Sequence, residues 1–201
     1  MKKYLKWVVC FISLVVFMVL SFLVITKKDI YLDSLVYNFI SKYITNNLTN
    51  IVKYLTYIGS ALVVIGITIF VLIFFKNKKY ALYMTINLLV ITIFQYILKN
   101  IFSRTRPIDI NLIEESGYSF PSGHSLTAMA FYGFIIYSIY VSDISKHDKT
   151  LFITLFSILI FITGLSRIYL GVHYFTDVLG GFTFSLFYLI IYTSIVKKRL
   201  N

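Results

Sequence analysis

Six long hydrophobic runs, separated by short polar segments, dominate the chain. A helix needs about 20 consecutive apolar residues to cross the hydrocarbon core of a bilayer. The runs that meet this length are Trp7–Thr26, Tyr54–Phe75, Tyr80–Leu98, Ser125–Ser142, Leu151–Leu170 and Val178–Val196. The pattern predicts an all-α fold, in which six transmembrane helices form a single membrane-embedded domain over residues 1–201.

A shorter amphipathic segment lies between the first two runs. Apolar residues recur at helical spacing through Ile30–Ile44, but this segment is too short and too polar to span a membrane. We expect a helix that lies in the membrane interface, with Asp29 as a candidate N-cap.

The first run is preceded by Lys2, Lys3 and Lys6, as the apolar core of a signal peptide would be. However, no alanine occurs before Ala61, so an Ala-x-Ala cleavage site is absent. The run is also longer than the usual core of a signal peptide. We expect a retained anchor helix.

Composition agrees with a membrane protein. Hydrophobic residues make up 59% of the chain, against about 45–50% in soluble domains. The net charge is +11, but the basic residues lie mostly at the ends of the apolar runs, which indicates membrane anchoring and not nucleic-acid binding. Cys10 is the only cysteine, so no internal disulfide can form.

Charge also predicts the orientation. Six spans place both termini on one side, and that side carries 11 of the 19 Lys and Arg residues. By the positive-inside rule, both termini are cytoplasmic. The many Ile, Lys and Asn residues are typical of an AT-rich genome and favour a bacterial cell membrane.

Three polar clusters interrupt the hydrophobic pattern at membrane boundaries. KNIFSRTRP, Lys99–Pro107, ends the third run; PSGH, Pro121–His124, begins the fourth; and SRIYLGVHYFTD, Ser166–Asp177, joins the fifth and sixth. With six spans, all three clusters lie on the same extracytoplasmic face. The sequence therefore predicts one functional site at this face.

Three cations in these clusters predict an anion site. Lys99, Arg106 and Arg167 would repel one another in a medium of low dielectric. Of the carboxylates expected outside, only Asp177 lies within a cluster, so we expect a ligand to supply the missing negative charge. Phosphate suits arginine, whose planar guanidinium donates two hydrogen bonds at once.

The start of the fourth run fits the same ligand. Ser122 and Gly123 lie where the helix begins, and a helix N-terminus offers free backbone N–H groups and a favourable dipole. Gly123 also removes the side chain that would block close approach.

Two histidines and a carboxylate predict covalent catalysis. His173 and Asp177 are four residues apart, so on a helix they would share one face. A carboxylate bonded to one ring nitrogen fixes the tautomer and leaves the other nitrogen free to attack phosphorus. His124, from another helix, can then donate a proton to the leaving oxygen.

Simpler interpretations remain for single residues. A lone His or Arg at a helix end is most often an interface anchor, and His147, in a polar cytoplasmic loop, is interpreted as solvated. Arg104 stays open between a headgroup contact and a phosphate ligand. There is no HExxH motif or cysteine pair, and the three cations oppose a metal ion, so we expect neither a metal nor another cofactor.

Together the clusters resemble the three-part signature of the type 2 phosphatidic acid phosphatase superfamily, K-x6-R-P, P-S-G-H and S-R-x5-H-x3-D, with no departure at a motif position. The resemblance implies a six-helix membrane bundle that hydrolyses phosphate esters without a metal. It implies a phosphohistidine at His173, with Asp177 as the orienting partner and His124 as the general acid. The phosphate cradle that it implies consists of Lys99, Arg106, Ser122, Gly123 and Arg167, with Ser166 close by.

The resemblance implies that the substrates are lipid phosphates or diphosphates. The position of the site agrees, because a site at the ends of membrane helices lies at headgroup depth, where a lipid can enter from the bilayer. Bacterial members of the family act on phosphatidylglycerophosphate, phosphatidic acid or undecaprenyl diphosphate, and the sequence does not separate these. A lipid phosphotransferase is one alternative. A transporter that only binds the phosphate ester is another, although transporters often contain an inverted repeat and none is apparent here.

Overall fold

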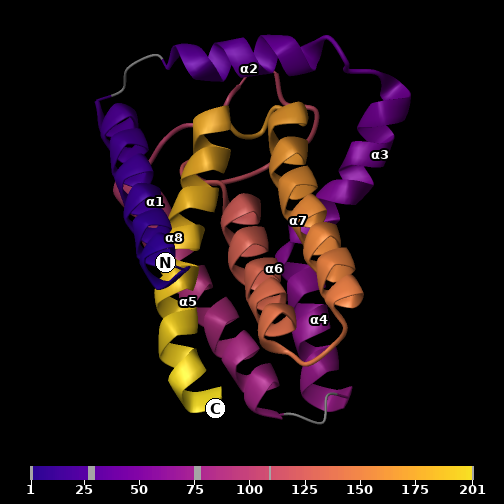
Figure 1. Cartoon of the computed structure of the whole chain (residues 1–201). Helices are drawn as coiled ribbons and strands as arrows, with labels where there is room; N and C mark the ends of the chain where they lie inside the picture. Colours follow the sequence, from indigo (N-terminus) through magenta and orange to yellow (C-terminus); the bar gives the residue numbers. More distant parts are fainter. Residues whose placement is uncertain (1, 27–29, 75–77, 109, 201) are drawn as a thin grey trace.

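The computed structural model describes residues 2–26, 30–74, 78–108 and 110–200, and every regular element in these ranges is helical (Figure 1). The elements are α1 Lys2–Ile25, α2 Tyr31–Ser41, α3 Asn46–Thr56, the short 3-10 helix η1 Tyr57–Gly59, α4 Ala61–Phe74, α5 Lys78–Phe102, α6 Gly123–Val141, α7 Lys146–Tyr169 and α8 Phe175–Leu200. The predicted all-α class is confirmed.

Within the described ranges, five helices are long and apolar enough to cross a membrane: α1, α5, α6, α7 and α8. A sixth crossing is present if Asn46–Gly59 and Ala61–Phe74 are taken as one span that bends by 47°. The prediction of a continuous second helix over Tyr54–Phe75 is therefore wrong. That run begins within α3, breaks after Gly59 and continues as α4, and Phe75 itself lies outside the described residues.

The break in the second span is held by tight packing around Gly59. A Cβ atom on Gly59 would lie 2.2 Å from the side chain of Thr163 on α7 and 3.4 Å from the backbone oxygen of His124 on α6. A broken helix frees carbonyl groups, and Tyr132 of α6 donates a 2.6 Å hydrogen bond to the carbonyl oxygen of Ile58. The broken span is thus drawn close to α6 and α7.

Helix α2 lies across one end of the bundle (Figure 1). It covers Tyr31–Ser41, within the predicted interfacial segment, but Ile30 and not a polar residue stands at its N-cap. The candidate cap Asp29 lies outside the described residues. The first turn contains Asp33, whose side chain is buried.

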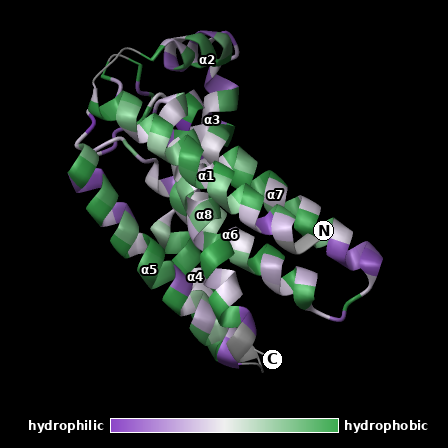
Figure 2. Ribbon diagram, turned by 60° about the vertical axis from the view of Figure 1, so that its left-hand side comes forward, coloured by the Kyte–Doolittle hydropathy of each residue, from purple (hydrophilic) through white to green (hydrophobic). Residues whose placement is uncertain are grey.

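Helix α6 is the centre of the bundle. It packs against α5, α7 and α8, while α1 packs on α8 (Figure 1). Small buried residues on α6, such as Ala128 and Ala130, allow close helix contact. Asn87 of α5 is fully buried and donates a 2.9 Å hydrogen bond to the carbonyl oxygen of Ala130. Figure 2 shows hydrophobic residues over much of the helices, with hydrophilic residues gathered towards the helix ends and loops.

Two connections meet at the end of the bundle that α2 covers: the α5–α6 loop, residues 103–122, and the α7–α8 connection, residues 170–174. Gly171 turns the second connection with a φ of +67°, and a Cβ atom there would overlap the carbonyl group of Ile110. The N–H of Leu112 donates a 2.9 Å hydrogen bond to the carbonyl oxygen of Leu170. These contacts dock the long loop against the segment that carries His173.

Candidate active site

All three sequence motifs contribute to one cavity at the end of the bundle near α2. The cavity has a volume of about 120 Å³. Its walls come from η1, α4, α5, α6 and both connections, through Gly59, Ala61, Gln95, Lys99, Arg106, Glu115, Gly123, His124, Thr127 and His173. Five predicted site residues therefore share its lining: Lys99, Arg106, Gly123, His124 and His173.

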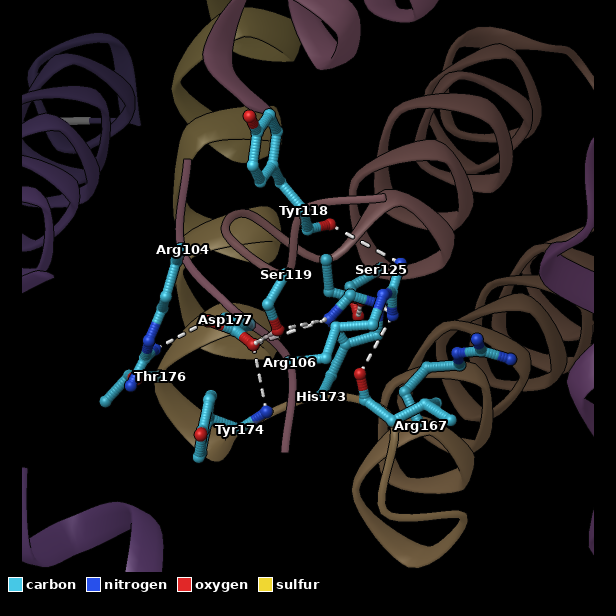
Figure 3. A network of polar contacts seen from close by, with 12 residues as sticks. Arg104, Arg106, Tyr118, Ser119, Ser125, Arg167, His173, Tyr174, Thr176 and Asp177 are labelled. Atoms are coloured by element: carbon cyan, nitrogen blue, oxygen red, sulfur yellow. Dashed lines mark hydrogen bonds and ion pairs between the residues drawn. The ribbon is translucent and has the colours of Figure 1, made fainter. Parts of the chain in front are cut away.

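His173 is held at both ring nitrogens (Figure 3). Its Nε2 atom lies 3.0 Å from Nη1 of Arg106. Because a guanidinium can only donate hydrogen bonds, Nε2 must carry the lone pair and Nδ1 the hydrogen. Nδ1 lies 3.4 Å from Oδ2 of Asp177 and 3.3 Å from the hydroxyl of Ser119. The tautomer is thus the one that a nucleophilic Nε2 requires.

Asp177 is fully buried, and both of its carboxylate oxygens contact polar groups of the protein. Its Oδ2 accepts hydrogen bonds from the hydroxyl of Ser119 and, at 2.9 Å, from the N–H of Tyr174. Its Oδ1 lies 2.6 Å from Nη1 of Arg104. Figure 3 shows these contacts converging on the carboxylate. Ser119 was not predicted as a site residue, since it lies in the long loop outside every motif.

The environment of His173 favours its neutral form. Burial, with smaller contributions from the charges of Arg106 and Arg167, lowers the pKa of the imidazole to about 4, despite the opposing effect of Asp177. An ordinary histidine has a pKa of about 6.5. Near pH 7, His173 therefore has an available lone pair.

Lys99 and Arg106 bind the same stretch of loop. Nζ of Lys99 donates a 2.6 Å hydrogen bond to the carbonyl oxygen of Tyr118. Arg106 donates to the carbonyl oxygens of Ser116 and Gly117, each at 3.0 Å, and of Val172 at 2.8 Å. Both cations therefore face the cavity while tying the α5–α6 loop to its wall.

Arg167 contacts a carboxylate that was not predicted. Its Nη2 atom lies 2.6 Å from Oε2 of Glu115, and its Nη1 donates a 2.8 Å hydrogen bond to the hydroxyl of Thr56. Burial opposes ionisation of Glu115, but the charge of Arg167 outweighs it and lowers the pKa of that carboxyl. The expectation that only Asp177 brings negative charge to the clusters is wrong, because loop folding brings Glu115 into the cavity.

Of the small residues predicted for the phosphate cradle, only Gly123 is among the residues that line the cavity. Gly123 lines the cavity, and a Cβ atom there would lie 2.7 Å from the side-chain nitrogen of Gln95. Ser122 is fully buried, and its N–H donates a 3.0 Å hydrogen bond to the carbonyl oxygen of Asp177. The hydroxyl of Ser166 donates to the carbonyl oxygen of Thr163 at 2.7 Å. The N–H of Ser122 and the hydroxyl of Ser166 are thus already used within the protein.

His124 lies in the first turn of α6 and lines the cavity together with His173. His173 itself lies in the α7–α8 connection, before α8 begins at Phe175, so the expectation that His173 and Asp177 share one face of a helix is wrong; their contact comes from the turn that leads into α8. In the described parts of the chain, no group of three or more His, Cys, Asp or Glu residues has the geometry to hold a metal ion.

Arg104 joins the site from the opposite side of Asp177. One nitrogen contacts Asp177, and Nη2 lies 2.8 Å from Oδ2 of Asp33 on α2. Burial alone would lower the pKa of Arg104, but the charges of Asp177 and Asp33 outweigh it and raise the pKa above its ordinary value. Neither of the two roles considered for Arg104 from the sequence includes this contact.

The fold and the motif placement define a class of protein. Residues 78–201 match the model of the PAP2 superfamily, and the chain belongs to this superfamily, as the sequence motifs predicted. Within it, the chain is similar to phosphatidylglycerophosphatase B of Bacillus subtilis (strain 168), with 44% identity over 92 residues. The matched region covers 45% of the chain and 45% of the length of that relative.

Solved structures show the same architecture. The fold is similar to that of the first transmembrane PAP2 type phosphatidylglycerolphosphate phosphatase from Bacillus subtilis, with a TM-score of 0.85 and 26% identity over 94% of this chain and 96% of that one. It also resembles Aquifex aeolicus LpxE, with a TM-score of 0.70 over 84% of this chain and 98% of that one. The second match has 24% identity and supports the fold alone.

Proposed function

We propose that this chain is a metal-independent membrane phosphatase that hydrolyses a lipid phosphate or lipid diphosphate through a phosphohistidine at His173. One observation supports this most strongly. Nε2 of His173 carries a lone pair at the wall of a cavity that Lys99 and Arg106 also line. A nucleophile beside a cluster of cations fits attack on a phosphoryl group.

The proposed reaction has two displacements. Nε2 of His173 attacks phosphorus, the bond from phosphorus to the lipid oxygen breaks, and His124 transfers its proton to that oxygen. His124 then takes a proton from water, and the resulting hydroxide attacks the phosphohistidine. This releases inorganic phosphate and restores His173. Asp177 stabilises the positive imidazole ring through Nδ1.

The proposed cradle consists of Lys99, Arg106 and Arg167, with the backbone around Gly123. The phosphate would replace Glu115 at Arg167 and would take over hydrogen bonds that the cations now make to the loop. Ser122 and Ser166 would support this cradle from behind, since their polar groups bond to the protein itself.

The proposed substrate is a phosphorylated lipid for two reasons. The cavity lies where the helices end, with walls that include the start of α4 and the last turns of α5, and in a bilayer this end of the bundle would lie at the depth of the lipid headgroups. The curated relative is named phosphatidylglycerophosphatase B. Phosphatidylglycerophosphate is therefore the first substrate to test, ahead of phosphatidic acid and undecaprenyl diphosphate.

The direct test is phosphate release by the purified protein in detergent with EDTA. We expect release from at least one of these three lipids, with loss in the His124→Ala variant. Activity that disappears in EDTA and returns with a divalent cation would contradict the metal-independent mechanism. If phosphate appeared on a second lipid and not in solution, the chain would be a phosphotransferase. Binding without any turnover would favour a transporter.

We further propose that the site faces the exterior of the cell membrane and that both termini are cytoplasmic. In a Cys10→Ser background, a cysteine at Ile108, which is 79% exposed in the α5–α6 loop, should react with an impermeant maleimide in intact cells. A cysteine at Asp143, in the exposed α6–α7 turn, should react only after lysis. The reverse pattern would place the site on the cytoplasmic face.

A further inference from the structure

Asp177 is held by two sets of partners that act on different oxygens. Oδ2 faces His173, Ser119 and the N–H of Tyr174. Oδ1 is bonded only from the other side among the contacts of the described residues, by Nη1 of Arg104 at 2.6 Å. The orientation of the carboxylate therefore depends on Arg104 as well as on the groups around the imidazole.

Arg104 is itself fixed by α2 and by an aromatic ring. Its Nη2 atom lies 2.8 Å from Oδ2 of Asp33, the acidic residue in the first turn of α2. Its guanidinium carbon lies 4.0 Å from the ring centre of Tyr174. The side chain of Arg104 is only 15% exposed and that of Asp33 only 8%. Buried charges of this kind are costly unless they are paired, so Arg104 depends on the carboxylates of Asp33 and Asp177, and each carboxylate depends on Arg104.

Asp33 also caps the helix that carries Asp177. Its Oδ1 accepts a 2.8 Å hydrogen bond from the N–H of Thr176, in the first turn of α8, and its Oδ2 accepts a 2.9 Å bond from the hydroxyl of Thr176. That hydroxyl in turn accepts a 2.8 Å bond from Nη1 of Arg104. A carboxylate at a helix N-terminus is favoured by the free N–H groups and by the helix dipole.

We infer that Asp33 and Arg104 are positioning residues. Through them, α2 holds the carboxylate of Asp177 in the orientation that the nucleophilic His173 needs. The inference rests on the proposed function, since it assigns a role within the same reaction. By this inference α2, which lies across one end of the bundle (Figure 1), is linked to the pair formed by His173 and Asp177. The inference also gives Arg104 a role other than binding phosphate.

Two observations separate Arg104 from the phosphate cradle. Both of its terminal nitrogens contact carboxylates. It also lines a different cavity, of about 980 Å³, together with Asp33 and the ends of α1 and α5. On this side α2 faces an open space, and its polar contacts with Arg104 and Thr176 add to the apolar packing of Val36 and Ile40 near Val178 of α8.

The kinetic test compares Arg104→Gln, Arg104→Lys and Asp33→Asn with an Asp143→Asn control at an exposed carboxylate on the α6–α7 turn. We expect Arg104→Gln to lower kcat by about tenfold to a hundredfold, similar to the loss of a hydrogen-bonded partner that orients a metal-ligating histidine, with KM changed less than about threefold. Arg104→Lys should recover part of kcat. Because Asp33→Asn keeps a side-chain oxygen that can accept the N–H of Thr176, its main loss is the ion pair with Arg104, so the double variant Arg104→Gln/Asp33→Asn should lose no more than Arg104→Gln alone. A rise in KM with kcat unchanged would make Arg104 a phosphate ligand and overturn the inference.

A titration tests the coupling without any need for turnover. The chain has three histidines, so histidine-labelled protein allows NMR assignment of His173 with single His→Ala variants. In the wild-type protein His173 should titrate at about 4. Arg104→Gln leaves the negative charge of Asp177 uncompensated, so the His173 titration should rise by about one pH unit.

The outcomes of the two experiments are distinct. If the wild-type protein released no phosphate from any lipid, the proposed function would fail, while the titration would still test the positioning role. An unchanged titration in Arg104→Gln, or a loss of activity that only follows a lower unfolding temperature and is not eased by Arg104→Lys, would overturn the positioning role.

Discussion

At the scale of single residues, the site is a balance of buried charges. Among the described residues around it, Lys99, Arg104, Arg106 and Arg167 face the carboxylates of Asp33, Glu115 and Asp177. Two of these carboxylates are bound from several sides, whereas Glu115 is 30% exposed and contacts a cation of the proposed cradle. Glu115 therefore occupies a position for which a phosphate would compete.

This competition predicts the effect of Glu115→Gln. Removing one negative charge beside Arg167 should strengthen binding of inorganic phosphate, measured as a competitive inhibition constant, by about threefold to tenfold. The size is limited because the pair is partly exposed and screened by solvent. Glu114→Gln, at the exposed neighbouring residue, is the matched control and should leave the constant unchanged. Weaker phosphate inhibition in Glu115→Gln would mean that Glu115 assists phosphate binding.

The sequence predicted those site residues that belong to polar motifs at the ends of apolar runs. Lys99, Arg106, Gly123, His124 and His173 stand in dense polar motifs at helix ends, and they line one cavity. Glu115, Ser119 and Asp33 could not be found in this way. Their contacts depend on how a long loop and an interfacial helix fold back on the bundle, and neither follows from hydrophobic periodicity.

At the scale of elements, the broken second span shows what hydropathy cannot detect. The run Tyr54–Phe75 is apolar enough to suggest one helix, but Gly59 packs against Thr163 and Ser60 adopts an extended conformation. The turn brings Gly59 and Ala61 to the wall of the cavity. Other elements, from α5 to α8, lie close to their predicted ranges because their apolar runs are not interrupted.

The tight packing at the break predicts that the same substitution has very different effects on stability at two glycines of this span. Gly59→Val should lower both the unfolding temperature in detergent and the turnover rate, because its Cβ atom would overlap Thr163 at 2.2 Å; overpacking of this kind costs about 1–3 kcal/mol. Gly66→Val is the control, since a Cβ atom there meets nothing within 4 Å. Equal unfolding temperatures for the two variants would show that the contact at Gly59 is not tight.

At the scale of the whole molecule, the bundle places its chemistry at one end. The motif residues come from α5 to α8 and from the α5–α6 and α7–α8 connections, within the region that matches the PAP2 superfamily. The N-terminal half adds α2 and the broken span, which reach the same end through Asp33 and Gly59. The halves are thus joined at the site, and sequence motifs in the C-terminal half alone could not show this.

The most direct test of the account is the trapping of a phosphoryl group on His173. The purified protein is mixed with a lipid phosphate radiolabelled in its phosphoryl group and quenched within milliseconds. We predict a protein-bound label that is stable in base and labile in acid, as expected for a phosphohistidine. His173→Ala should lose both the label and turnover, while His147→Ala, at a histidine that is 88% exposed, should keep both. Turnover near the wild-type rate in His173→Ala would contradict the proposed phosphohistidine mechanism.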